Sequence, residues 1–177
     1  MHTHVLVVGG TGILAPAVGS CLRRGWPTTV VSRRPAGSGT ARPAAPAHVV
    51  ADVTRPAEFA GALDRAVAER GPITLALAYQ PFAPAQSWRL LADRTAGLLV
   101  ALLVSAHAAE DGPAAPLAAG RQGGATVVHV LLGWHRDADG VRWHTPQEVS
   151  AATIRAVDER AGRVLGAVRP WEERPGR

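Results

Sequence analysis

The stretch Val5-Leu6-Val7-Val8-Gly9-Gly10-Thr11-Gly12-Ile13-Leu14-Ala15 decides how this chain folds. An apolar run leads into a glycine-rich turn, and a helical pattern begins directly after the turn. This order is typical of a parallel strand that feeds a helix N-terminus, where backbone N–H groups hold a pyrophosphate. Gly9 and Gly12 allow a tight turn close to the phosphates, and Ala15 permits close helix–strand packing. The stretch therefore predicts a dinucleotide site, with a plain strand–turn–helix as the alternative.

The end of the next apolar run indicates which dinucleotide is bound. Residues 28–32 end where an NAD-binding unit carries an acidic residue for the ribose hydroxyls. This chain has Ser32, Arg33 and Arg34 there instead. A carboxylate would repel a 2′-phosphate, whereas guanidinium groups pair with it in a forked geometry. The sequence favours NADP(H) over NAD(H), and a solvated arginine loop is the alternative.

Composition restricts the class of protein. The chain has 177 residues, of which 47% are hydrophobic, enough for one domain with a buried core. A net charge of +5 and a pI of about 11.1 would suit a nucleic-acid binder. All 19 basic residues are arginine, however, and they are scattered among few aromatic residues. We therefore expect no nucleic-acid groove.

The sequence also predicts a cytoplasmic protein with no membrane partner. No apolar run is long and clean enough to span a bilayer, and the N-terminus lacks the basic region and apolar core of a signal peptide. The single cysteine, Cys21, excludes an internal disulfide and fits a cytosolic protein. On the first helix it is predicted to be a core residue, and since no base is paired with it in sequence, it is not a nucleophile.

Apolar runs alternate with helical patterns along the whole chain, 1–177. This predicts a single α/β domain with a Rossmann-like doubly wound sheet, mostly parallel, of about six to seven strands with helices on both faces. The expected helices are 12–24, 56–70, 85–96 and 146–160. The expected strands are 5–8, 28–32, 48–51, 73–78, 98–104, 126–132 and 164–168, with loops at 36–47 and 106–124.

Three boundaries depend on local signals. Thr54 is the predicted N-cap of the second helix, and Thr145-Pro146-Gln147-Glu148 has the form of an N-cap, a proline at N1 and a capping-box partner. Residues 98–104 are ambiguous by period. We predict a buried strand there rather than a longer helix, because Gly97 is a good helix stop and the run ends at Ser105.

These motifs resemble the short-chain dehydrogenase/reductase superfamily, especially its small atypical bacterial members. The resemblance rests on residues 9–15, on Arg33-Arg34 and on Asp52-Val53, which match the family's adenine-contacting pair. The tail from Trp143 to Glu148 and from Val168 to Trp171 is also similar to the small members. The cofactor site that the resemblance implies consists of Gly9, Thr11, Gly12, Ile13, Leu14, Ser32, Arg33, Arg34, Asp52, Val53, Ala78, Tyr79 and Gln80. It further implies a homodimer or other homo-oligomer.

The chain departs from the family in its catalytic residues. Standard members carry Tyr-x-x-x-Lys on a helix after the fifth strand, where the lysine lowers the tyrosine pKa and holds the nicotinamide ribose. This chain has no lysine, and its single tyrosine, Tyr79, precedes the fifth strand. Residues 106–124, where that helix would lie, are broken by glycine and proline. The cofactor-binding half of the family pattern is present and the standard catalytic half is absent.

Other side chains must then act on the substrate. Ligands of a doubly wound sheet bind beyond the carboxyl ends of its strands. Those ends supply the catalytic candidates Tyr79, Ser105, His107 and His135, and the substrate contacts Gln80 and Trp134. Tyr79 can donate a hydrogen bond to a carbonyl, Ser105 stands in the place of the family's catalytic serine, and either histidine can act as acid or base near neutral pH.

Each candidate also has a structural explanation. Tyr79 can contact the cofactor alone, the histidines can be exposed loop residues, and Trp134 and Trp143 can pack rather than bind substrate. His129 lies inside an apolar run and is predicted to be a hydrogen-bonded core histidine. His2 and His4 have a spacing that can chelate a metal, but no third ligand is evident, so we predict no metal site.

The sequence therefore predicts an NADP(H)-dependent oxidoreductase acting on a small carbonyl or enone substrate, of the kind found in secondary metabolism. The proton would come from water or a histidine, since the cofactor carries the difficult chemistry. Two alternatives stay open. One is a non-redox cyclase, dehydratase or isomerase on the same scaffold, and the other is a non-catalytic NADP(H)-binding sensor or accessory protein. Fold alone does not choose among them.

Overall fold

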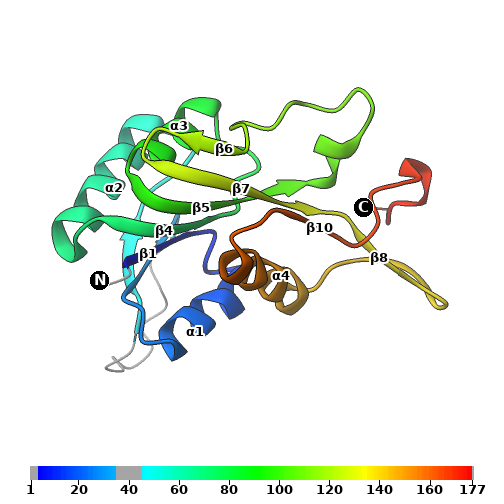
Figure 1. Cartoon of the computed structure of the whole chain (residues 1–177), viewed down its shortest axis with the longest axis horizontal. Coiled ribbons are helices and arrows are strands. Elements are labelled where there is room, and N and C mark those ends of the chain that lie inside the picture. Colours follow the sequence, from blue (N-terminus) through cyan, green and yellow to red (C-terminus); the bar gives the residue numbers. More distant parts are fainter. Residues whose placement is uncertain (1–3, 35–44, 177) are drawn as a thin grey trace.

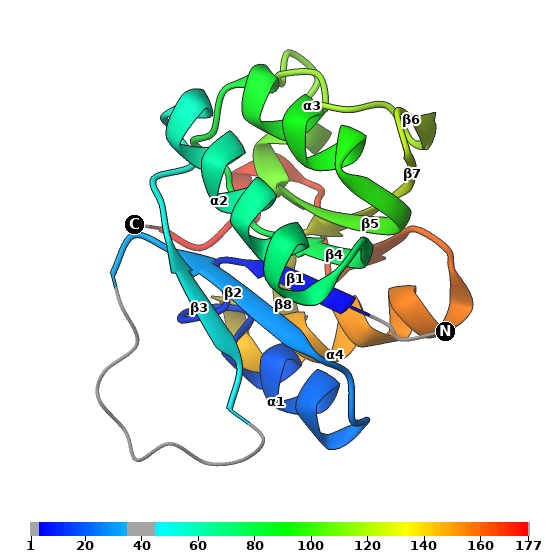
Figure 2. The same ribbon diagram turned by 90° about the vertical axis from the view of Figure 1, so that its left-hand side faces the viewer.

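A computed structural model describes residues 4–34 and 45–176. These residues form an α/β architecture in which helices cover both faces of one main sheet (Figures 1 and 2). His2 and most of the loop predicted at 36–47 lie outside the described residues. None of the helices within those two ranges is both long and apolar enough to cross a membrane.

The main sheet confirms the predicted fold class. Its strands are β1 (His4–Val8), β2 (Thr28–Ser32), β3 (Ala47–Val50), β4 (Ile73–Ala78), β5 (Thr95–Val104), β6 (Gly120–Gln122), β7 (Ala125–Leu132) and β10 (Arg163–Leu165). The order across the sheet is β10-β7-β5-β4-β1-β2-β3, with every neighbouring pair parallel. The short β6 pairs antiparallel with β7. The order reverses between β1 and β4, which is where ligands of doubly wound sheets bind.

The helices form two layers. They are α1 (Ala15–Arg23), α2 (Pro56–Arg70), α3 (Ala85–Asp93) and α4 (Pro146–Glu159), with short 3-10 turns η1 (Ser105–Ala108) and η2 (Trp171–Glu173). The pair α2 and α3 covers one face of the sheet, and the pair α1 and α4 covers the other (Figure 2). Both faces of the central strands are therefore buried, which explains their continuous apolar runs.

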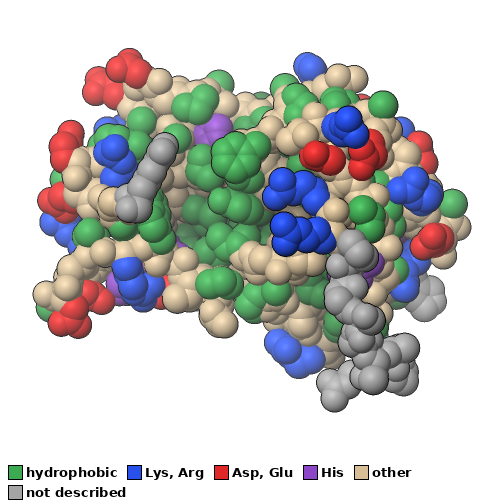
Figure 3. Space-filling model, turned by 180° about the vertical axis from the view of Figure 1, so that it is seen from behind, with side chains coloured by type: hydrophobic (Ala, Val, Ile, Leu, Met, Phe, Trp, Pro, Cys, Tyr) green, Lys and Arg blue, Asp and Glu red, His purple; other side chains and the backbone are tan. Residues whose placement is uncertain are grey.

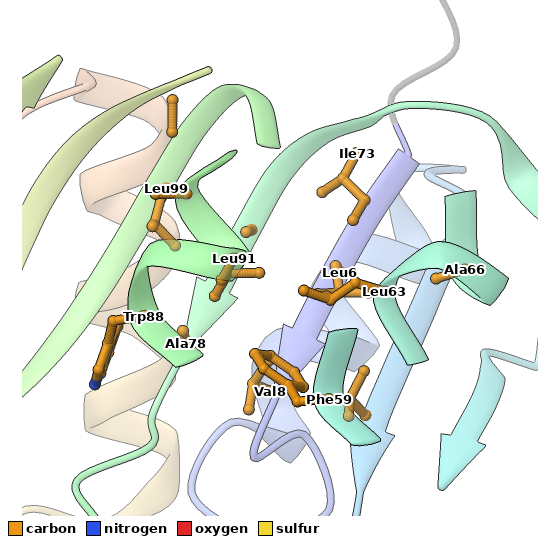
Figure 4. Packing of buried hydrophobic residues seen from close by; sticks show 14 of the residues in the cluster. Leu6, Val8, Phe59, Leu63, Ala66, Ile73, Ala78, Trp88, Leu91 and Leu99 are labelled. Atoms are coloured by element: carbon orange, nitrogen blue, oxygen red, sulfur yellow. The ribbon is translucent and has the colours of Figure 1, made fainter. Parts of the chain in front are cut away.

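Strand β1 is buried along its whole length because it lies inside the sheet. Successive side chains point to opposite faces. Leu6 and Val8 pack with Phe59 beneath α2 and α3 (Figure 4), whereas Val5 belongs to the cluster beneath α1 and α4. Each large apolar side chain buried in this way contributes about 1.5–3 kcal/mol. The glycine turn thus begins at the end of a firmly held strand.

The ambiguous segment 98–104 is a strand, as predicted, but for a different reason at its start. Helix α3 ends at Asp93 rather than Ala96, and β5 begins at Thr95. Gly97 lies inside β5 and does not stop the helix. A Cβ atom at this position would lie 2.1 Å from the Thr74 carbonyl oxygen, so glycine is needed for the close approach of β4 and β5.

The two predicted helix caps have different outcomes. Thr145 caps α4 in a complete capping box with Glu148, as predicted. The N-cap of α2 is Arg55, with no side-chain cap bond, so the prediction for Thr54 was wrong. The Thr54 N–H and hydroxyl instead donate to the Asp52 carboxylate, at 2.9 and 2.7 Å. Because Thr54 is hydrogen-bonded to the Asp52 side chain, it does not cap α2 as expected.

Sequence reasoning missed a hairpin between β7 and α4. Strands β8 (Trp134–Asp137) and β9 (Gly140–Trp143) form a separate antiparallel pair. Only Trp134 is buried in this hairpin, so its sequence has no alternating apolar pattern. The Trp134 ring meets Trp143 and Trp171 edge-on, with centroids 6.4 and 6.2 Å apart. Its backbone exchanges two hydrogen bonds with Ala167, which ties the hairpin to the segment after β10.

Cys21 is confirmed as a core residue, and His129 is confirmed as a hydrogen-bonded histidine that is only partly buried. Cys21 on α1 is fully buried, and burial raises the pKa of its thiol to about 11, so it stays a protonated, unreactive thiol at neutral pH. His129 lies within β7, and its Nε2 is 3.0 Å from the Leu117 carbonyl oxygen. Burial lowers the pKa of His129, which keeps the ring neutral in its hydrogen bond.

Candidate functional site

Two adjoining cavities lie beyond the carboxyl ends of the parallel strands. The larger, of about 610 Å³, follows β1, β2, β3 and β4, and we call it the large cleft. The other, of about 260 Å³, follows β4, β5 and β7, and we call it the small cavity. Ile13 and Tyr79 line both of them, so the two spaces meet. Figure 3 shows a hollow of mainly hydrophobic side chains in the middle of one face, with basic side chains beside it.

Most of the predicted cofactor residues line the large cleft: Gly9, Thr11, Gly12, Ile13, Ser32, Arg33, Asp52, Val53, Tyr79 and Gln80. The structure differs for three others. Leu14 and Ala78 are fully buried in the core, where they support the cleft without facing it. Arg34 is exposed and lies outside the lining. Sequence reasoning missed Phe82, which lies on the cleft and is 88% exposed, although its place just after β4 was a usable signal.

The glycine turn has the geometry of a phosphate cradle. Gly9 has φ +85°, and a Cβ atom there would lie 2.9 Å from the Tyr79 carbonyl oxygen, so no other residue fits without strain. The Gly12 N–H closes the turn by donating to the Gly9 carbonyl oxygen at 3.2 Å. The N–H groups of Ile13 and Leu14, directly before α1, donate to no backbone carbonyl within the described ranges. Such groups at a helix N-terminus can hold an anion.

The buried amide of Gln80 indicates whether the large cleft is suited to a ligand. Its side chain is 2% exposed, and neither its amide nitrogen nor its amide oxygen has a hydrogen-bond partner among the described residues. A buried polar group without a partner costs about 1–3 kcal/mol. A bound molecule that supplies one acceptor and one donor would remove this cost, so the cleft is suited to a polar ligand such as a dinucleotide.

Arginine and aspartate meet at the outer end of the large cleft. Arg33 follows β2 and lines the cleft, and the Ser32 hydroxyl donates to the Arg34 carbonyl oxygen at 2.6 Å. The pKa of Asp52 is lowered, first by the hydrogen bonds from Thr54 and to a smaller extent by the charge of Arg33. The carboxylate is therefore ionised at neutral pH, and Arg33 keeps this end of the cleft from being purely acidic.

The small cavity brings together two of the predicted catalytic residues, Tyr79 and Ser105. Tyr79 comes directly after β4, and Ser105 directly after β5, as expected for neighbouring parallel strands. Burial raises the pKa of the Tyr79 phenol, and no charged group among the described residues lowers it. The phenol therefore stays protonated at neutral pH, which lets it donate a hydrogen bond but makes it a poor proton-transfer group.

The structure places the other candidates outside the small cavity. His107 is carried away by η1, where its Nδ1 is 2.8 Å from the Pro113 carbonyl oxygen, and it lines a separate cavity. His135 lies on β8, with its Nε2 2.8 Å from the Asp137 carboxylate. Trp134 is fully buried in hairpin packing, whereas Trp143 is the tryptophan that lines the small cavity. Neither η1 nor the hairpin had been predicted, so these placements could not be foreseen.

His144 lines the small cavity and was not among the sequence candidates. It lies between β9 and α4, and its side chain is only 5% exposed. Neither ring nitrogen has a hydrogen-bond partner in the part of the chain that the structure describes. Its place just before the Thr145 cap was visible in sequence, but nothing there indicated that the ring turns inward.

His135, His144 and Glu148 have potential metal-binding atoms within 4.8 Å of one another. Both Glu148 oxygens, however, already accept hydrogen bonds from Arg142, at 2.8 and 2.9 Å. This hydrogen bonding holds the pKa of Glu148 far below its usual range. A guanidinium in direct contact with the carboxylate opposes a second cation, so these residues are better suited to an ion-pair network than to a metal.

Comparison with known proteins identifies the fold. No protein-family model matches the chain, and no curated protein matches it. Solved structures do. A doubly substituted Serratia marcescens short-chain dehydrogenase/reductase is 17% identical, covering 94% of this chain and 96% of that one, with a TM-score of 0.68. A Brucella ovis oxidoreductase of the same family, in complex with a partially ordered NAD, is 13% identical over 94% and 99%, with a TM-score of 0.59. NADH-dependent reductase A1-R′, complexed with NAD, is 15% identical over 93% and 94%, with a TM-score of 0.63.

At these identities the likeness is one of fold. The described residues have the Rossmann-like fold of short-chain dehydrogenases/reductases, and the match extends over nearly the whole chain. The scaffold that carries the two cavities is thus one on which oxidoreductases are built, while its catalytic side chains must be argued from this chain alone.

Proposed function

We propose that the protein is an NADP(H)-dependent reductase of small carbonyl or enone compounds. The observation that carries this proposal is the large cleft, which combines a glycine turn, an arginine and the unpartnered Gln80 amide. The nicotinamide cofactor, when bound, supplies a hydride. The names of two structural neighbours describe complexes with NAD, which supports a nicotinamide cofactor, while the choice of the phosphorylated form rests on Arg33.

Different residues of the large cleft would bind different parts of the dinucleotide. The N–H group of Ile13, which lines the cleft directly before α1, would help to hold the pyrophosphate. Asp52 and Val53 would border the adenine, and Arg33 would pair with the 2′-phosphate, since a guanidinium matches the geometry of a phosphate. The choice of NADP(H) thus depends on Arg33, which follows β2 where an NAD site carries an acid.

The small cavity supports the choice of substrate class. Its walls are mainly apolar, from side chains such as Val104, Leu132 and Trp143. Its polar groups include the Tyr79 phenol and the Ser105 hydroxyl. A small apolar molecule with one carbonyl oxygen would fill such a space and use these few donors.

Titration calorimetry with NADPH, NADP⁺, NADH and NAD⁺ tests the proposal. We expect the phosphorylated forms to bind roughly 10- to 100-fold more tightly, because hydrogen bonds between charged groups contribute about 1.5–3 kcal/mol. Arg33→Glu should reverse this preference. Arg89→Glu, which makes the same charge change on the exposed face of α3, is the control and should leave it unchanged. Equal affinities for all four nucleotides before and after Arg33→Glu would contradict the proposal.

One observation favours a second function. The chain lacks lysine and has no tyrosine after β5, so it lacks the standard catalytic pair. A non-redox cyclase, dehydratase or isomerase would need only the acid–base groups of the small cavity. Turnover of a substrate with no change in nicotinamide absorbance would support this alternative, whereas binding without turnover would favour a non-catalytic NADP(H) sensor.

A further inference from the structure

His144 is held rigidly at the inner end of the β8–β9 hairpin. It directly precedes Thr145, whose hydroxyl accepts a hydrogen bond from the Glu148 N–H and whose own N–H donates to the Glu148 carboxylate at 2.8 Å. A Cβ atom at Gly166 would lie 2.3 Å from the His144 Nε2 atom. Glycine at position 166 therefore leaves the space that the ring occupies. The capping box and this glycine together fix where the imidazole lies.

Neither ring nitrogen of His144 is hydrogen-bonded to another described residue, although its Nδ1 atom lies 3.5 Å from the Glu148 carboxylate. A histidine with a structural role normally has a bonded ring nitrogen, as His129 has with Leu117. The two nitrogens of His144 have no such partner, although the side chain is 95% buried and lines the small cavity. Buried polar groups left without partners in a folded protein are found where a ligand or a catalytic step uses them.

From this we propose that His144 donates the proton to the carbonyl oxygen of the substrate in the small cavity, in place of the absent tyrosine–lysine pair. The inference rests on the reductase function proposed above. Tyr79 and Ser105 line the same cavity and would orient the carbonyl oxygen by hydrogen bonds. His144 would thus be the general acid. The Tyr79 phenol, which stays protonated, would only donate a hydrogen bond.

The charged and titratable groups around His144 are consistent with this role. They are Glu148 on α4, Arg142 on β9, His135 and Asp137 on β8, and Tyr79 after β4. The Glu148 carboxylate lies 3.5 Å from the His144 Nδ1 atom and attracts the positive charge of a protonated ring. Glu148 is therefore a positioning residue. His135, whose ring centroid is 5.9 Å away, is already paired with Asp137.

The carbonyl carbon would receive the hydride that bound NADPH supplies, leaving NADP⁺, and the C=O double bond would become a C–O single bond. The carbonyl oxygen takes the proton from the ring N–H of the His144 imidazolium, giving the alcohol and a neutral imidazole. Water returns the proton to the ring after product release.

The first test observes hydrogen bonding without turnover. Acetophenone labelled with ¹³C at the carbonyl is added to the protein saturated with NADP⁺, which has no hydride to give. In the wild type we expect a downfield shift of the carbonyl resonance, because a charged donor polarises the C=O bond. The shift should be lost in His144→Leu and kept in His48→Leu, a matched change on β3 far from the cavity.

The second test uses activity and stability. With NADPH and either acetophenone or 2-cyclohexenone, we expect His144→Gln to lower kcat roughly 100-fold or more, as for loss of a general acid. The affinity for NADPH should not change. His144→Leu should also keep or raise Tm, because it removes unpartnered buried nitrogens.

The outcomes separate this inference from the proposed function. If NADPH binds and the His144 variants reduce the carbonyl probes at the wild-type rate, the inference is overturned while the reductase function stands. A larger loss in His135→Gln than in His144→Gln would also overturn it, as would failure of both probes to bind the NADP⁺ complex. Absence of nucleotide binding in calorimetry would instead reject the reductase function itself, and the proposed step with it.

Discussion

The two cavities differ in how the chain builds them. The large cleft is made from short stretches that directly follow β1, β2, β3 and β4, which are neighbours in the sheet from β4 to the β3 edge. The small cavity draws on segments spread from Ile13 to Val149, including the end of a hairpin that lies outside the main sheet. A cofactor site of this kind is encoded in contiguous motifs, whereas a substrate site is assembled by distant contacts.

The same contrast holds for the packing beneath them. Under the large cleft, β1 is buried at every residue and pairs with strands on both sides. Beside the small cavity, β8 and β9 are mostly exposed and depend on Trp134 and two hydrogen bonds to Ala167. We therefore expect the sheet around β1 to stay folded when the β8–β9 hairpin is disrupted. Disruption of the sheet around β1 should unfold the hairpin as well.

The largest expected effect comes from truncating the main packing residue of each region. Phe59→Ala and Trp134→Ala each remove a fully buried aromatic ring, at a cost of about 3–5 kcal/mol if the loss is felt globally. Phe59→Ala should lower the free energy of unfolding by this amount in urea titrations. Trp134→Ala should cost less globally, because the hairpin can detach from the sheet.

Hydrogen exchange distinguishes the two cases. In Trp134→Ala, amide protection should fall in β8, β9 and the first turn of α4 and persist in β1 and β4. In Phe59→Ala, the protection of all these strands should fall together. Uniform loss of protection in both variants would show that the hairpin and the sheet unfold as one unit, and the contrast drawn above would fail.

A smaller effect is expected at the glycine turn. Gly9→Ala puts a Cβ atom against the Tyr79 carbonyl oxygen in a backbone conformation with positive φ, which costs about 1–3 kcal/mol. Because the strain lies in the large cleft, NADPH affinity in calorimetry should also fall, by roughly 10-fold or more. Gly61→Ala is the control. Its Cβ would meet only the end of Arg65 at 3.8 Å on α2, so it should stabilise by about 1 kcal/mol.

If Gly9→Ala left both stability and nucleotide affinity unchanged, the close approach of the turn to Tyr79 would not matter for binding. That result would remove the main reason for assigning the dinucleotide to the large cleft.

The smallest effect concerns the network that positions His144, and it depends on pH. The pKa of Glu148 is lowered in the folded protein, first by the hydrogen bonds from Arg142. A carboxyl group with a lowered folded pKa stabilises the fold above its unfolded pKa, of about 4.3, and loses this contribution as pH falls below it. Glu148→Gln, which can keep the capping-box bond, should therefore be slightly less stable than wild type at neutral pH. The difference should shrink as pH falls from about 5 to about 3.

Thr145→Ala provides the comparison for that experiment. It removes the cap itself, at a cost of about 1 kcal/mol that should change little with pH. Urea titrations of both variants at several pH values would check this. A Glu148→Gln difference that stayed constant down to acidic pH would mean that the ion pair with Arg142 adds nothing to stability.

Sequence reasoning succeeded where the signal is local. The glycine turn, the buried parallel strands and the Thr145–Glu148 capping box each depend on residues a few positions apart, and all three are present. It failed at Gly97 and Thr54, where a contact from elsewhere changed the role of the residue. Glycine is needed at position 97 because the backbone of β4 passes close to it. Thr54 does not cap its helix because it is hydrogen-bonded to Asp52.

By itself, the sequence determined the doubly wound sheet and the stretches that line the large cleft, because buried strands and tight turns have periodic or compositional signatures. Only the tertiary structure decided which histidine lies in the small cavity. His107 and His135 follow predicted strands and His144 precedes a predicted helix, and no pattern indicates which of the three rings is buried. Which ring is buried depends on η1, on the hairpin held by Trp134 and on the space left by Gly166. These contacts join residues far apart in the chain, and local propensity carries no information about them.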